Sequence, residues 1–495
     1  MAIRRYVASA DNTITNAYES NLATRGTGSN MGASDVSEVF HIYGQQDSGS
    51  MEAARALTQF PITNIATDRT AGTIPVSGSV SFYLRLYNAR HSETLPGNFQ
   101  LYVSALSQSW EEGDGLDMEG FTDLTYDATG SNWVRRSAGT AWDTEGGHYY
   151  TDTSSSFTAS FDNGTEDLEV DISPLVEQWL NSTGNVLGSK NNNGVVIRFP
   201  ATTETHTRSY YTKRFFARGT QYWFKRPIIE ARWDSSKKDN AGSFYLSSSL
   251  ASATENLNTI YLYNNIRGQL RNIPFSQHDP GTGSVMVSVY SGSTAPLGSK
   301  IGLPSGGGVV TATHTNVTGG YVSAGIYSAS FAYTSSAITT IFPVWHSGST
   351  EYHTGSGVTI KTFDSVDYSP SPSYVTTITN LKDIYSREEE ARFKIYIRQK
   401  GWNPSIYTKA KADPENLIIE DAYYRVIRTT DELDVVKYGT GSLNHTRLSF
   451  DVSGNYFDLP IDVLEDGYGY GIKLLYKLPN GLYKEQPNVF KFRVE

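Results

Sequence analysis

The stretch "SVSFYLRLY", residues 79–87, alternates between two kinds of side chain. The apolar residues Val80, Phe82, Leu84 and Leu86 alternate with Ser81, Tyr83, Arg85 and Tyr87. Because successive side chains of a β-strand point to opposite faces, this period of two predicts a strand with one buried face. The stretch "FQLYVSA", residues 99–105, repeats the pattern with Phe99, Leu101 and Val103 facing inward.

Similar short apolar stretches recur along the chain between turns rich in Gly, Asn and Ser. Further strands are predicted at 194–199, 226–233, 285–290, 321–333, 393–398, 417–428 and 471–477. The composition agrees, with 33 Tyr, 44 Gly, 5 Met and no Cys. Tyr, Thr and Val suit pleated, half-buried surfaces, and Gly and Asn suit the turns between them. The sequence therefore predicts an all-β protein built from sandwiches.

One segment, "DISPLVEQWLNSTGN" at 171–185, is predicted to be a short helix. Ser173 suits the N-cap, Pro174 the first helical position, and Gly184 the end of the helix. Its apolar stripe consists of Leu175, Val176, Trp179 and Leu180. A helix of about two turns is unstable alone, so it must pack on a sheet. A weaker helical turn is predicted in "SREEEAR", residues 386–392.

The length of 495 residues predicts several domains, because a single core rarely grows to that size. A charged connector, "WDSSKKDNAGS" at 233–243, follows a predicted strand. The segment "FDSVDYSPSPSY" at 363–374 has two prolines, which favours an extended linker. We therefore expect three β-sandwich-type domains in series: 1–235 with the short helix, a small immunoglobulin-like sandwich at 236–366, and a C-terminal β domain at 367–495.

The net charge and the lack of long apolar runs argue against several classes of protein. The net charge of −10 argues against a nucleic-acid binder. There is no run of eighteen apolar residues for a membrane span and no apolar segment near the start for a signal peptide. The Tyr-, Ser- and Thr-rich β texture is typical of proteins that persist outside cells. A virion component persists outside cells and needs no signal peptide, because it is made in the host cytoplasm and released by lysis.

The first 230 residues resemble the DNRLRE-type β-sandwich, a relative of carbohydrate-binding modules in surface and adhesive proteins. The resemblance rests on "RALTQFPI", "SFYLRLYNA", "SWEEGDG" and "GTAWDTEGGHY", after an opening "ASADNTITNAYESNLATRGTGSNMGAS". Its most specific part is "LEVDISPLVEQWLNSTGNVLGSKNNNGVVIRF" at 168–199. The sequence departs from the family in an insertion at 111–140 and in the tail from 213 onward. The resemblance therefore implies the fold rather than ligand binding.

That tail, with "NLNTIYLYNNIRGQLRNIP" and the C-terminal "GNYFDLP", "LLYKL" and "FKFRVE", resembles large structural proteins of tailed bacteriophages, especially marine ones. This second resemblance covers most of the chain. It implies a part of a virus particle without specifying which part.

The acidic stretch "SQSWEEGDGLDMEGFTDLTY", residues 107–126, has six carboxylates between Glu111 and Asp123. An EF-hand register fails, because Leu116 falls at the fifth position of a loop that starts at Glu112. We expect a solvated connection after a core Trp110. An irregular Ca²⁺ site through Asp114, Asp117 and Glu119 is the first alternative and a pair of catalytic carboxylates the second.

No motif indicates an enzyme. The nine histidines show no metal-ligand spacing, and there is neither a nucleophile elbow nor a phosphate-binding loop. His346 and His353 flank a predicted hairpin and are expected at the surface. We assign no catalytic and no cofactor-binding residue.

The aromatic residues of the insertion give the best indication of a contact surface. Trp133, Trp142, Tyr149 and Tyr150 are expected to be exposed and to form an interface with another protein, since Tyr and Trp are enriched in interfaces. Local packing and sugar stacking are the alternatives. Trp110 and Trp179 are expected in the core.

The sequence thus predicts a non-enzymatic structural component of a tailed-phage particle, namely a neck, collar, tail or head-surface appendage or decoration protein. Its partners would be other virion proteins or further copies of itself in a symmetric assembly. It would bind neither nucleic acid nor membrane, and no cofactor besides the candidate Ca²⁺. The alternative is a carbohydrate-binding adhesion module that recognises a glycan of the host surface.

Overall fold

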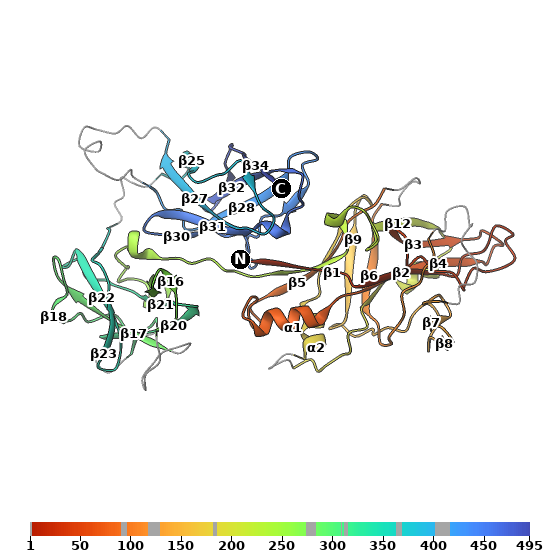
Figure 1. Cartoon of the computed structure of the whole chain (residues 1–495), viewed down its shortest axis with the longest axis horizontal. Helices are drawn as coiled ribbons and strands as arrows, with labels where there is room; N and C mark the ends of the chain where they lie inside the picture. The colour runs from red at the N-terminus through yellow and green to blue at the C-terminus, as the bar shows by residue number, and fades with distance from the viewer. Residues whose placement is uncertain are drawn as a thin grey trace. The chain divides into compact units, whose positions relative to one another are not determined.

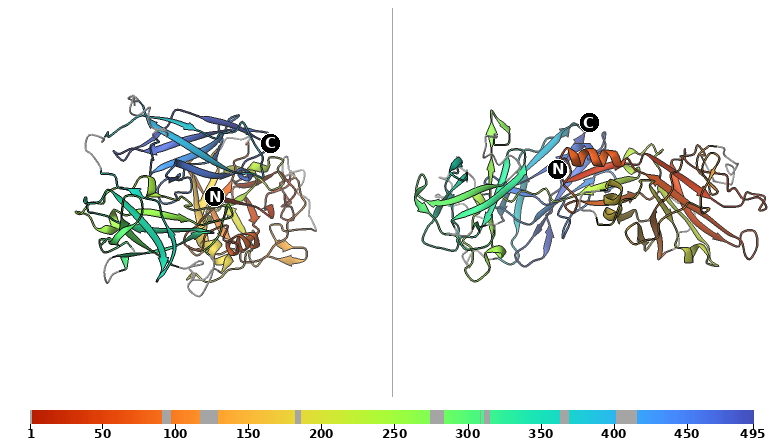
Figure 2. Two further views of the ribbon diagram at one scale, coloured as in Figure 1. Left: turned by 60° about the vertical axis from the view of Figure 1, so that its left-hand side comes forward. Right: turned by 90° about the horizontal axis from the view of Figure 1, so that it is seen from below.

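A computed structural model describes residues 2–90, 97–116, 129–181, 186–273, 284–307, 309–310, 315–362, 369–400 and 416–495. β-strands are the dominant element throughout these residues, which confirms the predicted all-β class (Figures 1 and 2). Contacts divide the chain into two compact units. Unit 1 is Met1–Asp234 with Gly441–His445 and Asp462–Glu465, and unit 2 is Ser235–Thr440, Thr446–Ile461 and Asp466–Glu495. The main segment of unit 1 ends beside the predicted boundary at 235; the three-domain division stays a prediction.

Two antiparallel sheets make up most of unit 1. The first has the order β1-β13-β5-β10, and the second the order β12-β3-β4-β11-β6-β9 with β2 paired to β4. A small ribbon, β7-β8, lies apart from both. The strands are β1 (Ile3–Val7), β2 (Ala10–Thr15), β3 (Val36–Tyr43), β4 (Met51–Gln59), β5 (Ser81–Leu86), β6 (Phe99–Ala105), β7 (Arg135–Ser137), β8 (Thr140–Ala141), β9 (Ser156–Phe161), β10 (Leu168–Asp171), β11 (Val195–Arg198), β12 (Tyr210–Phe216) and β13 (Ile228–Arg232).

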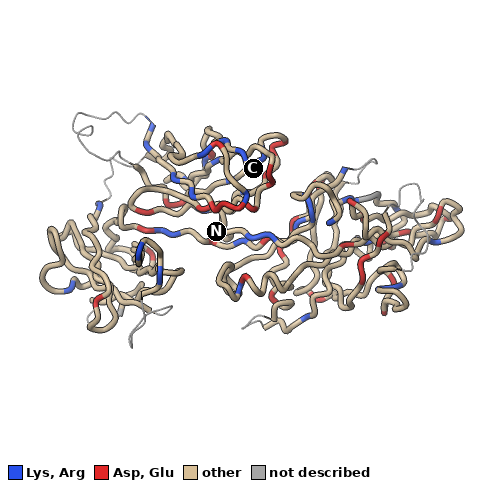
Figure 3. Tube along the Cα trace, in the orientation of Figure 1, with Lys and Arg blue, Asp and Glu red and all other residues tan. Residues whose placement is uncertain are grey.

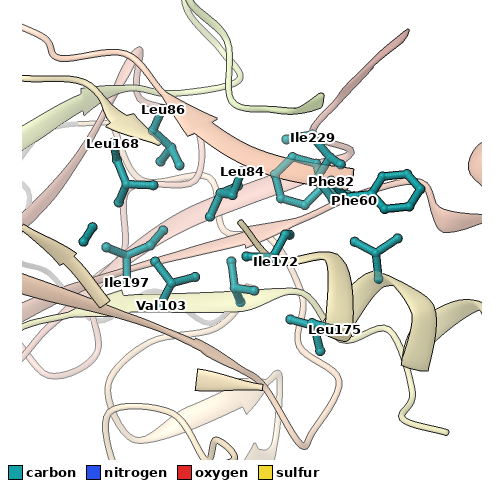
Figure 4. Packing of buried hydrophobic residues seen from close by; sticks show 14 of the residues in the cluster. Phe60, Phe82, Leu84, Leu86, Val103, Leu168, Ile172, Leu175, Ile197 and Ile229 are labelled. Atoms are coloured by element: carbon teal, nitrogen blue, oxygen red, sulfur yellow. The ribbon is translucent and has the colours of Figure 1, made fainter. Parts of the chain in front are cut away.

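The main core of unit 1 is built by the predicted alternation of side chains. Phe82, Leu84 and Leu86 of β5 are fully buried, and Val103 of β6 lies in the same cluster. Figure 4 shows these side chains meeting Ile197, Ile229 and Leu175. Both predicted strand faces, 79–87 and 99–105, are confirmed as the buried faces of β5 and β6. Arg85 and Tyr87, on the other face of the first stretch, are also buried.

The predicted short helix is present as α2 (Ser173–Leu180). Leu175, Val176 and Trp179 are buried and Leu180 packs against the same core, as the stripe predicts. The helix covers the expected range of about 173–181, but the predicted capping residues are wrong. Ser173 is the first helical residue and accepts a hydrogen bond from the Phe82 N–H (2.8 Å), and the C-cap is Asn181 in the left-handed conformation. Gly184 lies outside the described residues.

Two helices of unit 1 were not predicted. They are α1 (Ile62–Thr70) and the single turn α3 (Ala201–Glu204). Helix α1 buries only Ile65, so its sequence has no apolar stripe to reveal it. It is joined to α2 by a bidentate ion pair in which Arg69 donates to both oxygens of Glu177 (2.8 and 2.7 Å).

Unit 2 contains four further sheets. One has the order β14-β21-β20-β17-β22-β23, with β18 on β17, β19 on β20 and β24 on β22; the others are β15-β16, β25-β27-β31-β30, and β26-β34-β32-β28-β29 with β33 on β32. The strands are β14 (Asn258–Tyr263), β15 (Asn265–Ile266), β16 (Gln269–Leu270), β17 (Val285–Ser291), β18 (Leu297–Lys300), β19 (Val309–Val310), β20 (Asn316–Ser323), β21 (Ile326–Phe331), β22 (Thr340–Ser347), β23 (Thr350–Thr354), β24 (Val358–Thr359), β25 (Tyr374–Ile378), β26 (Ile384–Tyr385), β27 (Glu390–Gln399), β28 (Ala422–Arg428), β29 (Asp434–Val436), β30 (Ser449–Asp451), β31 (Gly454–Pro460), β32 (Gly469–Lys477), β33 (Tyr483–Glu485) and β34 (Phe490–Val494).

Two predictions for unit 2 were wrong. The stretch 321–333 is not one strand, because a turn at Gly325 (φ +72°) separates β20 from β21. The segment "SREEEAR" forms no helix; it turns directly into β27 at Glu390, where Ala391 and Phe393 are buried at a spacing of two. Residues 363–368 of the predicted linker lie outside the described part of the chain.

The predicted connector at 233–243 is partly integrated into a sheet. The Phe450 N–H of β30 donates to the Lys237 carbonyl (2.9 Å), and the Asp239 N–H donates to the Phe450 carbonyl (3.0 Å). Residues 237–239 thus extend the sheet that contains β30 and β31. The connector is therefore held by backbone hydrogen bonds rather than being a free spacer.

Candidate functional site

A groove of about 430 Å³ opens on unit 1 along β6 and β9. Its lining combines amides, hydroxyls, aromatic rings and one carboxylate, from Asn98, Phe99, Gln100, Tyr102, Ser160, Phe161, Asp162, Pro200, Thr202, Thr203 and Tyr210. These residues come from two paired strands, from α3 and from the start of β12. We refer to this site as the β6–β9 groove.

The alternation of β6 places the polar residues of the groove. Phe99, Leu101 and Val103 enter the core, so Gln100 and Tyr102 point to the opposite face. The strand pairing sets Gln100 opposite Ser160 and Tyr102 opposite Thr158. The Gln100 side-chain amide donates to the Ser160 hydroxyl (3.4 Å). Two neighbouring strands thus present a continuous row of hydrogen-bonding groups.

Aromatic rings of the groove are held by their neighbours. The ring of Tyr210 lies 5.7 Å from that of Phe199 and 6.2 Å from that of His206, measured between centroids. The guanidinium of Arg198 lies 5.4 Å from the centre of the Tyr102 ring. Both tyrosines line the groove while their rings are fixed by contacts outside it. A fixed ring contributes contact area to a ligand at a low entropic cost.

The chemistry of the groove suits a neutral polar ligand. Among its lining residues Asp162 is the only carboxylate, and there is no Lys, Arg or His. An anionic ligand such as a phosphate would therefore meet a negative charge without a cation to offset it. Amides, hydroxyls and tyrosine rings instead match the hydroxyls and apolar ring faces of a saccharide.

Beside the groove, two buried arginines stack on the rings of Trp133 and Tyr149. Arg55 donates to both carboxylate oxygens of Glu204 (3.0 and 2.6 Å) and to the Gly146 carbonyl (2.7 Å). Its guanidinium lies 4.9 Å from the centre of the Trp133 ring. Arg198 lies 4.2 Å from the centre of the Tyr149 ring, and burial lowers its pKa. We call these five residues the arginine–aromatic cluster: Arg55, Arg198, Glu204, Trp133 and Tyr149.

The prediction that Trp133 and Trp142 are exposed is wrong, because both are buried, with 7% and 5% of their surface accessible. They form a second core of unit 1 with Ile14, Ala53, Leu57, Leu106, Trp110 and Val196. Trp142 also donates its ring N–H to the Asn132 carbonyl (2.9 Å). Local packing, the first alternative in the sequence analysis, accounts for both tryptophans. Both tryptophans therefore pack onto residues of the sheet.

The two tyrosines of the predicted interface are half-buried. Tyr149 packs against the second core and Tyr150 against the main core. The Lys190 ammonium lies 4.9 Å from the centre of the Tyr150 ring. Their role in an interface stays a prediction. Trp110 and Trp179 are buried in the cores, as expected.

The described part of the acidic stretch, residues 107–116, is attached to neighbouring segments by hydrogen bonds. Glu112 accepts hydrogen bonds from the Asp11 N–H (2.8 Å) and from two nitrogens of Arg218 (3.2 and 2.7 Å). Asp114 accepts from the Thr129 hydroxyl (2.8 Å). Asp11, which is itself buried, accepts from the Arg218 N–H, and burial raises the pKa of its carboxyl to about 7.

Two glycines of the "EEGDG" stretch permit this attachment. The Asn30 side-chain oxygen accepts the Gly115 N–H (3.0 Å). A Cβ atom at Gly113 would lie 1.9 Å from that oxygen, and one at Gly115 would lie 1.9 Å from the Asn30 carbonyl oxygen. The glycines are required because the loop backbone packs directly on Asn30.

The structure places only one of the three predicted Ca²⁺ ligands. Asp117 and Glu119 lie outside the described residues, and only Asp114 is placed. No group of three carboxylate or imidazole side chains suited to a metal occurs in the part of the chain that the structure describes. The Ca²⁺ site therefore stays a prediction. Over the same residues no helix is long and apolar enough to cross a membrane.

A serine–histidine pair in unit 2 was not predicted. Ser288 of β17 lies 2.7 Å from Nε2 of His346 of β22, whose Nδ1 lies 3.1 Å from the Gly348 carbonyl oxygen. Ser288 is fully buried and also donates to the Asn316 side-chain oxygen (2.7 Å). A substrate has no access to this hydroxyl, so the pair stabilises the sheet. The predicted hairpin is confirmed as β22–β23, but His346 is buried rather than at the surface.

The sequence contains a partial signal for the β6–β9 groove. The outward positions of "FQLYVSA" hold Gln100 and Tyr102, an amide and an aromatic ring spaced to share one face. The other walls come from residues near 160, 200 and 210, which only the strand pairing brings together. No pattern in the sequence indicates that association.

Comparison with known proteins gives no family. No family model matches the chain, and no curated protein matches it. Among solved structures, the native conformation of E. coli alpha-2-macroglobulin is similar at 10% identity with a TM-score of 0.16, over 89% of this chain and 21% of that chain. A tetra-tandem repeat from the extending region of a large adhesion protein is similar at 8% identity with a TM-score of 0.15, over 89% and 70% of the two chains. These likenesses are too weak to support an argument about function.

Proposed function

We propose that the chain is a non-enzymatic structural component of a tailed-phage particle and that it acts through contacts with other proteins. The resemblances in the sequence suggest the particle. The observation that supports contact with proteins is a nearly uncharged sheet in unit 2 with exposed edge strands. We call this surface the β17–β23 sheet surface.

Charged residues are almost absent from this sheet. Between Val285 and Thr359 the sequence contains only Lys300 and Glu351, whereas 19% of the whole chain is charged. The tube through β17 to β23 is accordingly almost entirely tan in Figure 3. The centres of protein interfaces are depleted in charge, so this composition favours burial against a partner.

The strands at the margin of the sheet are accessible. All four residues of β18 are exposed, with Leu297 at 60%, and four of the five residues of β23 are exposed. Edge strands offer unpaired backbone groups to another chain, and soluble proteins usually protect them with charged side chains. Strand β23 has a single charged residue, Glu351. A partner strand could therefore add to this edge.

The partners would be other virion proteins or further copies of this chain. Virion parts occur in many copies related by symmetry, and a closed ring uses the same edge in every copy. The net charge of −10 keeps free copies soluble until the matching surfaces meet.

Blocking the edge tests the proposal. In the double variant Thr350→Lys with Thr354→Lys, new charges occupy exposed positions of β23. We expect purified particles made with this variant to contain severalfold fewer copies of the chain. The matched control, Ser336→Lys with Ala337→Lys, adds the same charge at exposed positions between β21 and β22. Equal incorporation of the two variants would contradict a role for the β23 edge.

A second candidate function, recognition of a host glycan, is favoured by the β6–β9 groove. Glycan-array binding followed by calorimetry on the purified chain would test it. We expect Tyr102→Ala and Gln100→Ala to weaken binding of a saccharide at least tenfold. Tyr222→Ala, which changes an exposed tyrosine outside the groove, should leave it unchanged. Equal binding by all three variants would exclude the groove as the site.

A further inference from the structure

Lys213 and Asn88 meet where the two sheets of unit 1 come together. Lys213 is on β12, the edge strand of the seven-stranded sheet, and Asn88 follows β5 of the four-stranded sheet. Asn88 pairs with Phe215 in an isolated antiparallel bridge. On either side of it the Ala89 N–H donates to the Arg214 carbonyl (3.0 Å) and the Phe216 N–H to the Tyr87 carbonyl (3.0 Å). The backbone thus fixes the two side chains against each other.

The Lys213 side chain is fully buried, which is rare for a lysine. Its Nζ atom donates to the Asn88 side-chain oxygen (2.6 Å) and to the carbonyls of Gly164 (2.8 Å) and Glu166 (2.7 Å). None of these three acceptors is a carboxylate. The rings of Phe161 and Phe215 lie on its flanks, 4.9 and 5.1 Å from Nζ to the ring centres.

This environment makes the neutral amine easier to form than in an exposed lysine. Burial lowers the pKa of Lys213 to about 8, while the carboxylates of Asp167 and Glu166 act in the opposite direction. A neutral lysine has a lone pair and is a nucleophile, and a desolvated pocket is one way in which proteins activate it. In the ammonium form all three N–H groups donate, one of them to the Asn88 side-chain oxygen. When that proton is lost, the two backbone carbonyls can hold the two remaining N–H groups, and the lone pair faces the Asn88 side chain.

A carboxylate is held against the backbone of Asn88. Asp167 accepts the backbone N–H of Asn88 (2.8 Å) and so is held next to the reacting groups. The phenylalanine rings exclude water, which would otherwise compete as a nucleophile. Fixed proximity of amine and amide replaces a slow encounter in solution.

We propose that Lys213 and Asn88 join in an intramolecular isopeptide bond that fastens the two sheets of unit 1. The Lys213 nitrogen attacks the side-chain carbonyl carbon of Asn88, and the new C–N bond forms as the bond from that carbon to the Asn88 nitrogen breaks. The proton lost by the attacking nitrogen passes through Asp167 to the leaving nitrogen, which departs as ammonia. No oxidant, reductant or cofactor is consumed.

Such a bond would close a long loop, since 125 positions separate the two residues. It would limit opening of the sandwich at the edge of β12 and restrict the unfolded chain, as a disulfide does in secreted proteins. The chain has no cysteine and therefore cannot form a disulfide, so the isopeptide bond would provide a covalent cross-link in its place.

Intact-mass spectrometry of the full chain tests the proposal. We expect the mass to be lower than that of the sequence by one molecule of ammonia, with a linked pair of peptides containing residues 88 and 213 after digestion. Asn88→Ala and Lys213→Met should each restore the full sequence mass. In Asn88→Asp the leaving group is a hydroxyl, so the loss should be one water molecule relative to that variant's sequence.

Lys190 provides the control. Its Nζ also donates to a side-chain amide oxygen, that of Gln178 (2.6 Å), but unlike Lys213 it pairs with a carboxylate, that of Asp152 (3.4 Å). Lys190→Met should therefore keep the ammonia deficit of the wild type. A wild-type chain with the full sequence mass, whose residues 88 and 213 appear in separate unmodified peptides, would overturn the proposal and leave Lys213 as a hydrogen-bonded buried ammonium.

Discussion

Trp133 shows what one residue's environment adds to its sequence context. In the sequence it is one of several aromatic residues in a polar insertion, and its exposure was predicted from that neighbourhood. In the structure it lies against the guanidinium of Arg55, which is itself held by Glu204. Neither partner is near it in the sequence, so no local pattern could identify this contact. Trp179, by contrast, was placed correctly because its partners recur at helical spacing within one segment.

Replacement of Trp179 by Ala should destabilise unit 1 by about 3–5 kcal/mol, the usual cost of removing a large aromatic side chain from a core. Trp179 is 8% exposed and belongs to the main core. Hydrogen-exchange mass spectrometry of the full chain would report the loss in peptides that contain α2 and β5. Tyr222→Ala, at an exposed position, is the control. Unchanged exchange rates in Trp179→Ala would contradict its place in the core.

Asp11 should make the stability of unit 1 depend on pH. Its pKa is raised to about 7 in the folded chain, from an ordinary value near 3.8. The folded state therefore binds the proton more tightly, so this carboxyl contributes its full stability below about pH 4 and loses it as the pH rises towards 7. Denaturation between pH 4 and 8 should show a smaller decline in Asp11→Asn than in the wild type. Identical pH profiles would show that Asp11 is not the titrating group.

At the scale of elements, the strands and α2 could be predicted because each repeats a period that its own residues display. The apolar positions of β5 and β6 recur every two residues, and those of α2 follow helical spacing. Helix α1 has the sequence "ITNIATDRT", in which Ile65 is the only buried residue. It is stabilised by its contact with α2, and such a tertiary contact leaves no periodic pattern in the sequence.

The ion pair between Arg69 and Glu177 should stabilise α1 measurably. Both side chains are mostly buried, with 16% and 12% of their surface exposed, and the geometry is bidentate. We expect a double-mutant cycle with Arg69→Met and Glu177→Gln to give a coupling energy of about 1–2 kcal/mol, above the value of exposed pairs. Hydrogen exchange of α1 peptides is the measurement. A coupling energy near zero would mean that α1 is held by its other contacts, such as Ile65 in the core and Asp68 with Arg4 and Tyr6.

At the scale of the whole molecule, the fold class followed from composition and period, but the contacts of the connectors did not. The predicted connector at 233–243 contributes residues 237–239 to the sheet of β30 and β31. Charged and small residues indicate a surface segment without indicating which sheet edge it joins. The β6–β9 groove could not be predicted for the same reason, because its walls come from segments that are distant in the sequence.

The role of the connector can be measured by comparing fragments 235–495 and 369–495. The Phe450 N–H donates to Lys237, which the shorter fragment lacks, whereas the Leu448 N–H donates to Ala422, which both contain. We therefore expect the Phe450 amide to exchange much faster in the shorter fragment and the Leu448 amide to exchange at a similar rate in both. Equal protection of Phe450 would show that the connector adds nothing to this sheet.

The central claim, a structural role within a phage particle, is tested most directly by locating the chain in intact particles by cryo-electron microscopy. We expect density for the chain at every symmetry-related position of a neck, collar, tail or head surface, with the β17–β23 sheet surface against a neighbouring protein. Absence of the chain from mature particles, or a purified chain that cleaves a polysaccharide with turnover, would contradict it.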